Sequence, residues 1–145
     1  MAEESRARER AQEFIDALRA LEEAEQEKAA TPTDAIVGLF AEDATLTSAA
    51  LRLAGEVRNG REGAAHFWTE YKRTIGNART EFHAVVAADN AAGLFWRTGV
   101  PEGDRKGGAP AYDGATLLAF NGDGKIARFD GYYDIVQLDR AFGGG

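Results

Sequence analysis

The sequence predicts an α+β fold in which helices come first and antiparallel strands follow. Apolar residues recur at helical spacing up to Gly76, and beyond it they alternate with polar residues as in strands. Consecutive strands after a helical segment are typical of α+β folds, whereas a parallel sheet alternates strand and helix. A chain of 145 residues has the length of one domain, so we expect a single domain over residues 1–145.

The N-terminal segment predicts a long amphipathic helix. One apolar stripe runs along it with spacings of four and three residues, and its members are Ala7, Ala11, Phe14, Leu18 and Leu21. Charged residues cover the other face. We therefore expect the acidic run from Glu22 to Glu27 to be a solvated helix surface.

Two more helices are predicted before Gly76. Thr33 or Asp34 caps a short helix that ends near residues 42–43. Its apolar face consists of Ile36, Val37, Leu39 and Phe40. Residues 44–53 alternate weakly, which predicts a strand with an irregular extension to Gly55. After a turn at Asn59-Gly60, helical spacing returns over residues 61–75.

Four strands joined as hairpins are predicted after Gly76, over residues 80–88, 93–100, 111–121 and 125–138. The second and third are separated by a segment rich in Gly, Pro and charge. The last two are separated by Asn121-Gly-Asp-Gly-Lys125, which we interpret as a hairpin turn. It lacks the ligand spacing of a calcium loop and the helix of a phosphate cradle.

Composition argues against several classes of function. The formal net charge of −7 repels phosphate backbones, so no nucleic-acid partner is expected. The chain has no cysteine, which excludes disulfides, thiolate nucleophiles, zinc–cysteine sites and iron–sulfur clusters. No segment has the apolar run of a signal peptide or a membrane span, so we expect a cytoplasmic protein with no membrane partner.

The sequence also lacks the common catalytic motifs. Phosphate-loop, dinucleotide, serine-hydrolase and zincin patterns are absent. The two histidines, His66 and His83, lie far apart in the pattern and have no carboxylate motif beside them. We therefore expect no metal and no cofactor.

Three local strings resemble the nuclear-transport-factor-2-like superfamily, in the branch of SnoaL-type polyketide cyclases, ketosteroid isomerases and limonene epoxide hydrolases. They are LFAEDATL, NGREGAAHFW and LLAFNGDGKIARFDGYYD, and the resemblance spans roughly residues 8–140. It implies a cystatin-like cone, in which three helices pack on a curved mixed or antiparallel sheet around a deep apolar pocket. It also implies a homodimer formed through the outer face of the sheet.

The catalytic residues of the ketosteroid isomerases are not carried over. Ser48 stands at the position of their aspartate base, and Phe14 and Thr116 stand at the positions of their oxyanion-hole tyrosine and aspartate. Proton abstraction next to a carbonyl loses its main sources of rate without a base and two strong donors. Steroid isomerase activity is therefore not expected.

The catalytic set of the epoxide hydrolases is retained in part. Arg97 matches their arginine, whereas Gly99 and Gly131 replace their two aspartates. An arginine orients or stabilises an anion, but it does not deprotonate water at neutral pH. The cyclases use an aspartate, and three residues would reach a pocket if a strand register shifts by one residue: Asp113, Asp130 and Asp134.

Strand alternation then predicts which side chains line the pocket that the resemblance implies. With Arg97 inside, as the resemblance implies, Gly93, Phe95 and Gly99 share its face. The next strand contributes Tyr112, Gly114, Thr116 and Leu118. The last strand contributes Phe129, Gly131 and Tyr133, while Arg128, Asp130, Tyr132 and Asp134 face out. The helices contribute Phe14, Leu18, Trp68 and Tyr71, and Ser48 adds a hydroxyl.

Three functions agree with the sequence, and the first two of them use this pocket. The first is an isomerase, cyclase, dehydratase or hydrolase for a small, apolar, oxygenated substrate. In it Arg97 orients or stabilises an oxyanion, and His83, Tyr133 or a displaced aspartate acts as acid or base. The second is a protein that binds such a molecule without turnover. The third is a dimeric interaction scaffold that uses its outer sheet face.

Overall fold

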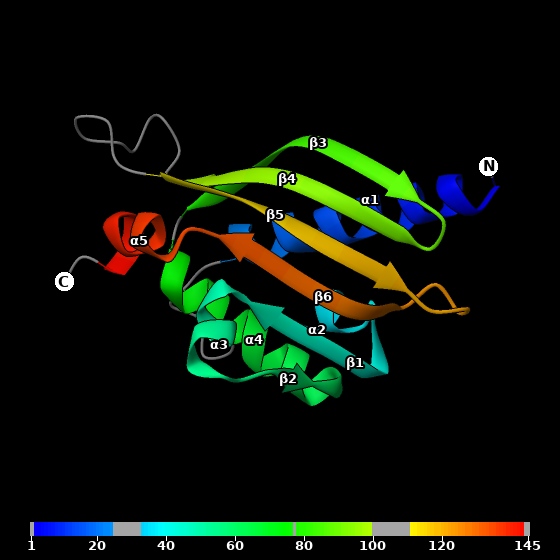
Figure 1. Cartoon of the computed structure of the whole chain (residues 1–145), viewed down its shortest axis with the longest axis horizontal. Helices are drawn as coiled ribbons and strands as arrows, with labels where there is room; N and C mark the ends of the chain where they lie inside the picture. Colours follow the sequence, from blue (N-terminus) through cyan, green and yellow to red (C-terminus); the bar gives the residue numbers. More distant parts are fainter. Residues whose placement is uncertain (1, 25–32, 77, 100–110, 144–145) are drawn as a thin grey trace.

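The computed structural model describes residues 2–24, 33–76, 78–99 and 111–143, and it confirms the α+β class (Figure 1). Its helices are α1 (Ala2–Glu23), α2 (Asp34–Val37), α3 (Ala49–Ala54), α4 (Gly60–Ile75) and α5 (Ile135–Leu138), which leads into one π-helical turn (Asp139–Gly143). Its strands are β1 (Phe40–Ser48), β2 (Arg58–Asn59), β3 (Arg79–Ala88), β4 (Ala91–Gly99), β5 (Ala111–Phe120) and β6 (Ile126–Tyr133).

The strands form one curved, mixed sheet in the order β2-β1-β6-β5-β4-β3. All neighbours are antiparallel except β1 and β6, which run parallel. Figure 1 shows α1 running behind β3, β4 and β5, and it packs on β3 and β4 while α4 packs on β1. No helix in the described ranges has both the length and the apolarity that a membrane span needs.

The core lies between these two helices and the sheet. The predicted stripe of α1 is buried, with Phe14 1% exposed and Leu21 1% exposed. The ring of Phe14 lies 5.7 Å from that of Trp68 on α4 and 6.0 Å from that of Phe129 on β6, measured between centroids. Aromatic side chains from both helices and the sheet therefore meet at one centre.

The second predicted helix is shorter than expected. The helix α2 ends at Val37, and Phe40 begins β1 rather than closing a helical face. The reason is pairing with the last strand: Ile126 N donates to Leu39 O at 2.8 Å, and Phe40 lies opposite Ile126 in the parallel ladder. The local helical pattern is overridden by a sheet contact far along the chain.

The strand predicted over 44–53 also ends early. Ser48 closes β1 and caps α3, because its Oγ accepts a hydrogen bond from Leu51 N at 3.2 Å. Gly55, with φ of 74°, then ends this helix. The residues predicted as an irregular extension therefore form a helix. The third predicted helix is confirmed as α4, which begins one residue earlier, at Gly60.

The hairpins after Gly76 are confirmed, with one correction at the end. The turn between β5 and β6 closes on Asn121, whose Oδ1 accepts from Asp123 N at 2.9 Å and Lys125 N at 3.0 Å. The last strand ends at Tyr133 rather than 138, because Asp134 caps α5 by accepting from Val136 N at 2.8 Å. The segment predicted as a Gly- and Pro-rich loop, and the end of the second strand at residue 100, lie outside the described residues.

Gly114 allows the indole of Trp96 to lie against β5. The two residues are directly opposite each other, and a Cβ at Gly114 would lie 2.5 Å from Trp96 Cη2 and 2.5 Å from Tyr132 O. Gly114→Ala should therefore lower the free energy of unfolding by about 1–3 kcal/mol, because the indole must move into an occupied interior. Denaturant unfolding of the purified variant measures the change.

The matched control is Gly93→Ala on the neighbouring strand β4. A Cβ there meets only Phe95 Cε2, at 3.9 Å. Its free energy of unfolding should stay within about 0.5 kcal/mol of the wild type or rise slightly. Equal losses in the two variants would show that Trp96 does not depend on the missing side chain at Gly114.

Candidate ligand-binding pocket

A cavity of about 260 Å³ opens between α1, α4 and the inner face of the sheet. Most of its wall is apolar or aromatic, and hydroxyl groups interrupt it at several points. Its lining residues are Phe14, Leu18, Ser48, Ala50, Leu51, Arg58, Phe67, Trp68, Glu70, Tyr71, Thr74, Thr80, Phe82, Trp96, Thr98, Tyr112, Thr116, Phe129, Gly131, Tyr133 and Leu138.

Most of the predicted lining residues do line this cavity. Those that do are Phe14, Leu18, Ser48, Trp68, Tyr71, Tyr112, Thr116, Phe129, Gly131 and Tyr133. Their rings support one another: Trp68 lies 5.3 Å from Phe129, and Tyr112 lies 5.6 Å from Tyr133, between centroids. Leu118 faces the same side but is fully buried in the core beside the cavity rather than in its wall.

The inward orientation predicted for Arg97 and Phe95 is wrong. Residues directly opposite in an antiparallel pair share a face, and Thr98 lies opposite Tyr112 while Arg97 lies opposite Asp113. The inner face therefore carries Leu94, Trp96 and Thr98, and the last two of these line the cavity. The Arg97 side chain is 58% exposed on the outer face, 3.5 Å from Asp113 Oδ1.

His83 is also outside the pocket, and a β-bulge explains its position. Phe82 pairs with Trp96 and Ala84 pairs with Phe95, so His83 is the extra residue between two consecutive pairs. The bulge reverses the alternation of β3, and His83 is exposed. Of the three residues predicted as catalytic, the cavity wall includes only Tyr133, whose hydroxyl accepts from Ala50 N at 3.4 Å.

The aspartates considered for a cyclase mechanism do not reach the cavity. Asp113 and Asp134 are exposed, and Asp134 is a helix cap. Asp130 faces out, as expected, but its side chain is only 3% exposed, with Arg128 Nε 2.6 Å from its Oδ2 and Arg52 Nη1 4.0 Å from its Oδ1. We assign Asp130 a structural role on the outer face.

A buried carboxylate that the sequence analysis placed on a solvated surface lies behind the cavity wall. Glu22 is 1% exposed, and its Oε1 accepts from Thr80 N at 2.8 Å. Its Oε2 accepts from Thr80 Oγ1 at 2.5 Å and from the Tyr71 hydroxyl at 2.6 Å. The chain of hydroxyls continues to Thr98, whose Oγ1 lies 2.7 Å from that of Thr80, and Tyr112 lies opposite Thr98 in the sheet. We call Glu22, Tyr71, Thr80, Thr98 and Tyr112 the Glu22 cluster.

Helical spacing contained a signal for Glu22. It follows Leu18 by four residues and Ile15 by seven, so it continues the buried side of α1. Its backbone oxygen accepts from Lys72 Nζ and from Arg79, each at 2.7 Å. Lys72 is itself buried, and desolvation lowers its pKa below the usual value.

Burial also changes the acidity of the two tyrosines of the Glu22 cluster. Desolvation, with the nearby charge of Glu22, raises the pKa of Tyr71 well above its usual value. Desolvation, with the neighbouring Tyr133, raises the pKa of Tyr112 as well. Both phenols therefore stay protonated at neutral pH.

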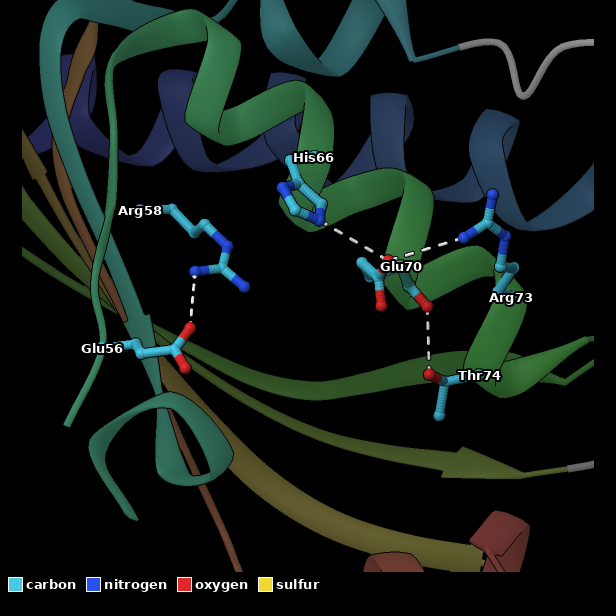
Figure 2. Close-up of polar contacts among 6 residues, drawn as sticks. All are labelled: Glu56, Arg58, His66, Glu70, Arg73 and Thr74. Atoms are coloured by element: carbon cyan, nitrogen blue, oxygen red, sulfur yellow. Dashed lines mark hydrogen bonds and ion pairs between the residues drawn. The ribbon is translucent and has the colours of Figure 1, made fainter. Parts of the chain in front are cut away.

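Charged side chains gather at the rim of the cavity (Figure 2). Arg58 Nη1 lies 3.0 Å from Glu56 Oε1, while on α4 Glu70 lies 3.5 Å from Arg73 Nη1 and 3.6 Å from His66 Nε2. Arg58 and Glu70 line the cavity, whereas His66 does not. Within the described residues no three His, Asp or Glu side chains come together as a metal site would require.

Comparison with known proteins agrees with this architecture. The model of the SnoaL-like domain matches residues 11–129. The chain belongs to the SnoaL-like family. No protein of curated function matches the sequence.

Solved structures share the fold of this SnoaL-like protein at low sequence identity. A SnoaL-like protein of unknown function from Burkholderia thailandensis is 20% identical, with a TM-score of 0.66 over 90% of this chain and 96% of its own. A proposed ketosteroid isomerase from Kribbella flavida is 18% identical, with a TM-score of 0.68 over 91% of this chain and 80% of its own. An NTF2-like protein of unknown function from Mesorhizobium loti is 21% identical, with a TM-score of 0.65 over 90% of this chain and 93% of its own.

The raised pKa of Tyr71 predicts a loss of stability in alkali. Above about pH 10 an unfolded tyrosine loses its proton while the folded state keeps it, so the folded state binds more protons and stability falls as pH rises. One such group contributes a slope of about 1.4 kcal/mol per pH unit until its folded pKa is reached. Tyr71→Phe should be less stable at neutral pH, but its stability should fall less steeply above about pH 10.

Urea unfolding of both proteins between about pH 9 and about pH 11.5 measures this difference. Lys72 and Tyr112 are present in both proteins, so their own titrations contribute to both curves. Parallel curves for wild type and Tyr71→Phe would contradict the prediction.

Proposed function

We propose that this SnoaL-like protein binds a small, mainly apolar molecule in the cavity. The observation that carries the proposal is the cavity itself, which leaves about 260 Å³ unfilled in a core whose side chains otherwise pack closely. An apolar cavity of roughly 150 Å³ is enough to bind benzene. The space here suits a molecule of about two fused rings.

The wall matches such a molecule in chemistry as well as in size. The rings of Phe14, Trp68 and Phe129 offer apolar contact, and hydroxyls of Thr98 and Tyr112 offer a few polar contacts. Apolar walls with a small number of polar groups are typical of small-molecule sites. Kinship with the SnoaL-like family, and the likeness in fold to a proposed ketosteroid isomerase, support a small-molecule site in this position.

We favour binding over turnover because the cavity offers few groups that transfer protons. Arg97 and His83, which would have stabilised charge or moved a proton, lie outside it. Among the described lining residues Glu70 is the one carboxylate, and its side chain is 55% exposed at the rim and paired with Arg73. An isomerase, cyclase, dehydratase or hydrolase that relies on Arg97 is not supported.

Blocking the rim tests the binding function. Thr74 is an exposed residue of α4 that lines the cavity, so Thr74→Trp should cover the opening without disturbing the core. We expect tetralin and 2-naphthol to raise the melting temperature of the wild type and to bind saturably in calorimetry. In Thr74→Trp the Kd should rise about tenfold or more, which is about 1.4 kcal/mol.

Arg73→Trp is the matched control, because Arg73 is the adjacent exposed residue of the same helix and does not line the cavity. It should bind both compounds as the wild type does. Binding that is unaffected by Thr74→Trp, or the absence of saturable binding in the wild type, would rule out this cavity as the site.

We also propose that two copies pair through the outer face of the sheet. One row of residues crosses four strands there, since Ala84 lies opposite Phe95, Phe95 opposite Ala115 and Ala115 opposite Tyr132. Phe95 is 41% exposed and Tyr132 is 46% exposed. An apolar row on an open sheet face suits a two-fold interface, in which the same surface meets itself.

Phe95→Lys should convert a dimer into a monomer, because a like charge would face its own copy across the two-fold axis. Light scattering coupled to size-exclusion chromatography measures the mass. Val57→Lys is the control, since Val57 is exposed but lies outside the sheet face. A monomeric wild type, or loss of the dimer in Val57→Lys alone, would contradict the proposed interface.

A further inference from the structure

Arg58 is the cationic side chain among the described residues that line the cavity. Its register in the sheet directs it inward, because Arg58 lies opposite Leu46 in β1 and Leu46 lies opposite Phe129 in β6. Residues paired in this way share one face of the sheet, and Phe129 lines the cavity. Arg58 therefore ends an inner row whose neighbouring members, Leu46 and Phe129, are apolar and buried.

Contact with α4 positions the side chain of Arg58 at the rim. A Cβ at Gly63 would lie 3.2 Å from Arg58 Cβ, so the side chain starts directly against this helix. Figure 2 shows it extending toward the part of α4 that carries His66 and Glu70. The side chain of Arg58 is 25% exposed, whereas that of Glu70 is 55% exposed. Of the two charges that line the cavity, Arg58 is the less solvated.

The contacts of Arg58 leave much of its hydrogen-bonding capacity unused. Its Nη1 donates to Glu56 Oε1 at 3.0 Å, and Glu56 is an exposed residue two positions earlier, so solvent weakens the pair. Within the described residues, Nε and Nη2 of Arg58 have no acceptor. Glu70 differs, because Arg73 Nη1 and His66 Nε2 both lie within 3.6 Å of its Oε1.

We infer that Arg58 holds an anionic group of the ligand at the rim, so that the bound molecule is a carboxylic acid with a compact apolar ring system. The N–H groups of Nε and Nη2 lie along one edge of a guanidinium, where a carboxylate accepts two parallel hydrogen bonds. A phosphate, with its higher charge, is disfavoured by the formal net charge of −7. The inference rests on the proposed binding function and specifies the chemical class of its ligand.

The two parts of such a molecule suit different parts of the site. The rings of Phe14, Trp68 and Phe129 contact the apolar part in the interior. A carboxylate at the rim keeps part of its hydration, so the contact with Arg58 stabilises the complex without the cost of burying a charge. Because this contact is partly exposed, we expect a modest gain in affinity that falls with ionic strength.

Compounds that share a naphthalene ring and a short arm separate the effect of charge from that of shape. They are 2-naphthylacetate, 2-naphthylacetamide and 2-(2-naphthyl)ethylamine, whose arms end in an anion, a neutral amide and a cation. Calorimetry at low ionic strength measures the Kd of each. We expect the wild type to bind the acetate about three- to tenfold more tightly than the amide, and about 0.5 M salt should reduce this ratio. A wild type that prefers the amine would assign the rim to Glu70 and overturn the inference.

The decisive variant is Arg58→Gln, which removes the charge and keeps a polar side chain. The ratio between acetate and amide should fall to about one, while the Kd of the amide stays within about twofold of the wild-type value. Arg97→Gln is the matched control, because it changes the net charge equally from the outer face of the sheet, where Arg97 pairs with Asp113. A preference for the acetate that survives in Arg58→Gln, or that is lost equally in Arg97→Gln, would overturn the inference. Thermal unfolding confirms that each variant is folded.

Glu56→Gln provides a second test that keeps Arg58 in place. It removes the carboxylate that competes for the guanidinium, so the acetate should bind about two- to fivefold more tightly while the amide binds unchanged. Unchanged or weaker binding of the acetate would contradict the role of Arg58. If the compounds bind the wild type equally, the inference is wrong while the binding function stands. If none of them binds, the proposed binding function fails and the inference fails with it.

Discussion

The burial of the Glu22 carboxylate is the interaction on which the arrangement of helices and sheet depends. A buried charge costs several kcal/mol unless hydrogen bonds compensate it. The compensating donors come from two other elements, because Tyr71 belongs to α4 and Thr80 belongs to β3. The backbone oxygen of the same residue accepts from Lys72 of α4. The end of α1 is thereby tied to the last turns of α4 and to the start of β3.

The hydrogen bonds around Glu22 separate two kinds of packing inside the molecule. Toward the starts of β1 and β6 the interior is apolar and closely packed, with Phe40, Leu46 and Ile126 buried. Toward the starts of β3 and β5, hydroxyls and aromatic rings surround open space. Polar groups that already satisfy one another cannot move inward to fill that space without losing their hydrogen bonds. The cavity is therefore a consequence of how the polar groups are paired.

Sequence patterns predicted the helices and hairpins well because each depends on neighbours in the chain. They failed where a contact between residues far apart in the chain determines which way a side chain faces. In β4 the alternate residues Leu94, Trp96 and Thr98 are less polar than their neighbours, so hydrophobicity alone predicts that they face inward. The opposite orientation was predicted because Arg97 matches the arginine of the epoxide hydrolases. The bulge at His83 is fixed by pairing across the sheet, and no local pattern shows it.

The buried side of α1 shows the converse case. Helical spacing places Glu22 on the buried face of α1. A carboxylate in an acidic run is normally solvated, so the prediction of a solvated surface followed the residue type rather than the helical spacing. Its partners Thr80 and Tyr71 come from segments about fifty residues or more away, and nothing in the sequence links them to it. Buried polar groups are the part of a site that sequence alone conveys least, because their partners are defined only by the fold.

Charge distribution connects these observations to the kind of molecule the cavity suits. The acid and the guanidinium of its described lining, Glu70 and Arg58, lie at the rim, while Arg97 lies on the opposite face of the sheet. An ionic group on a ligand would find no partner inside and would remain at the rim, where solvent and these side chains accommodate it. Under the proposed binding function, the interior selects a ligand by its shape and by its hydrogen bonds to the hydroxyl groups of the wall. Related proteins that share the fold at about 20% identity need not share this polar arrangement, since it depends on a carboxylate outside the cavity wall.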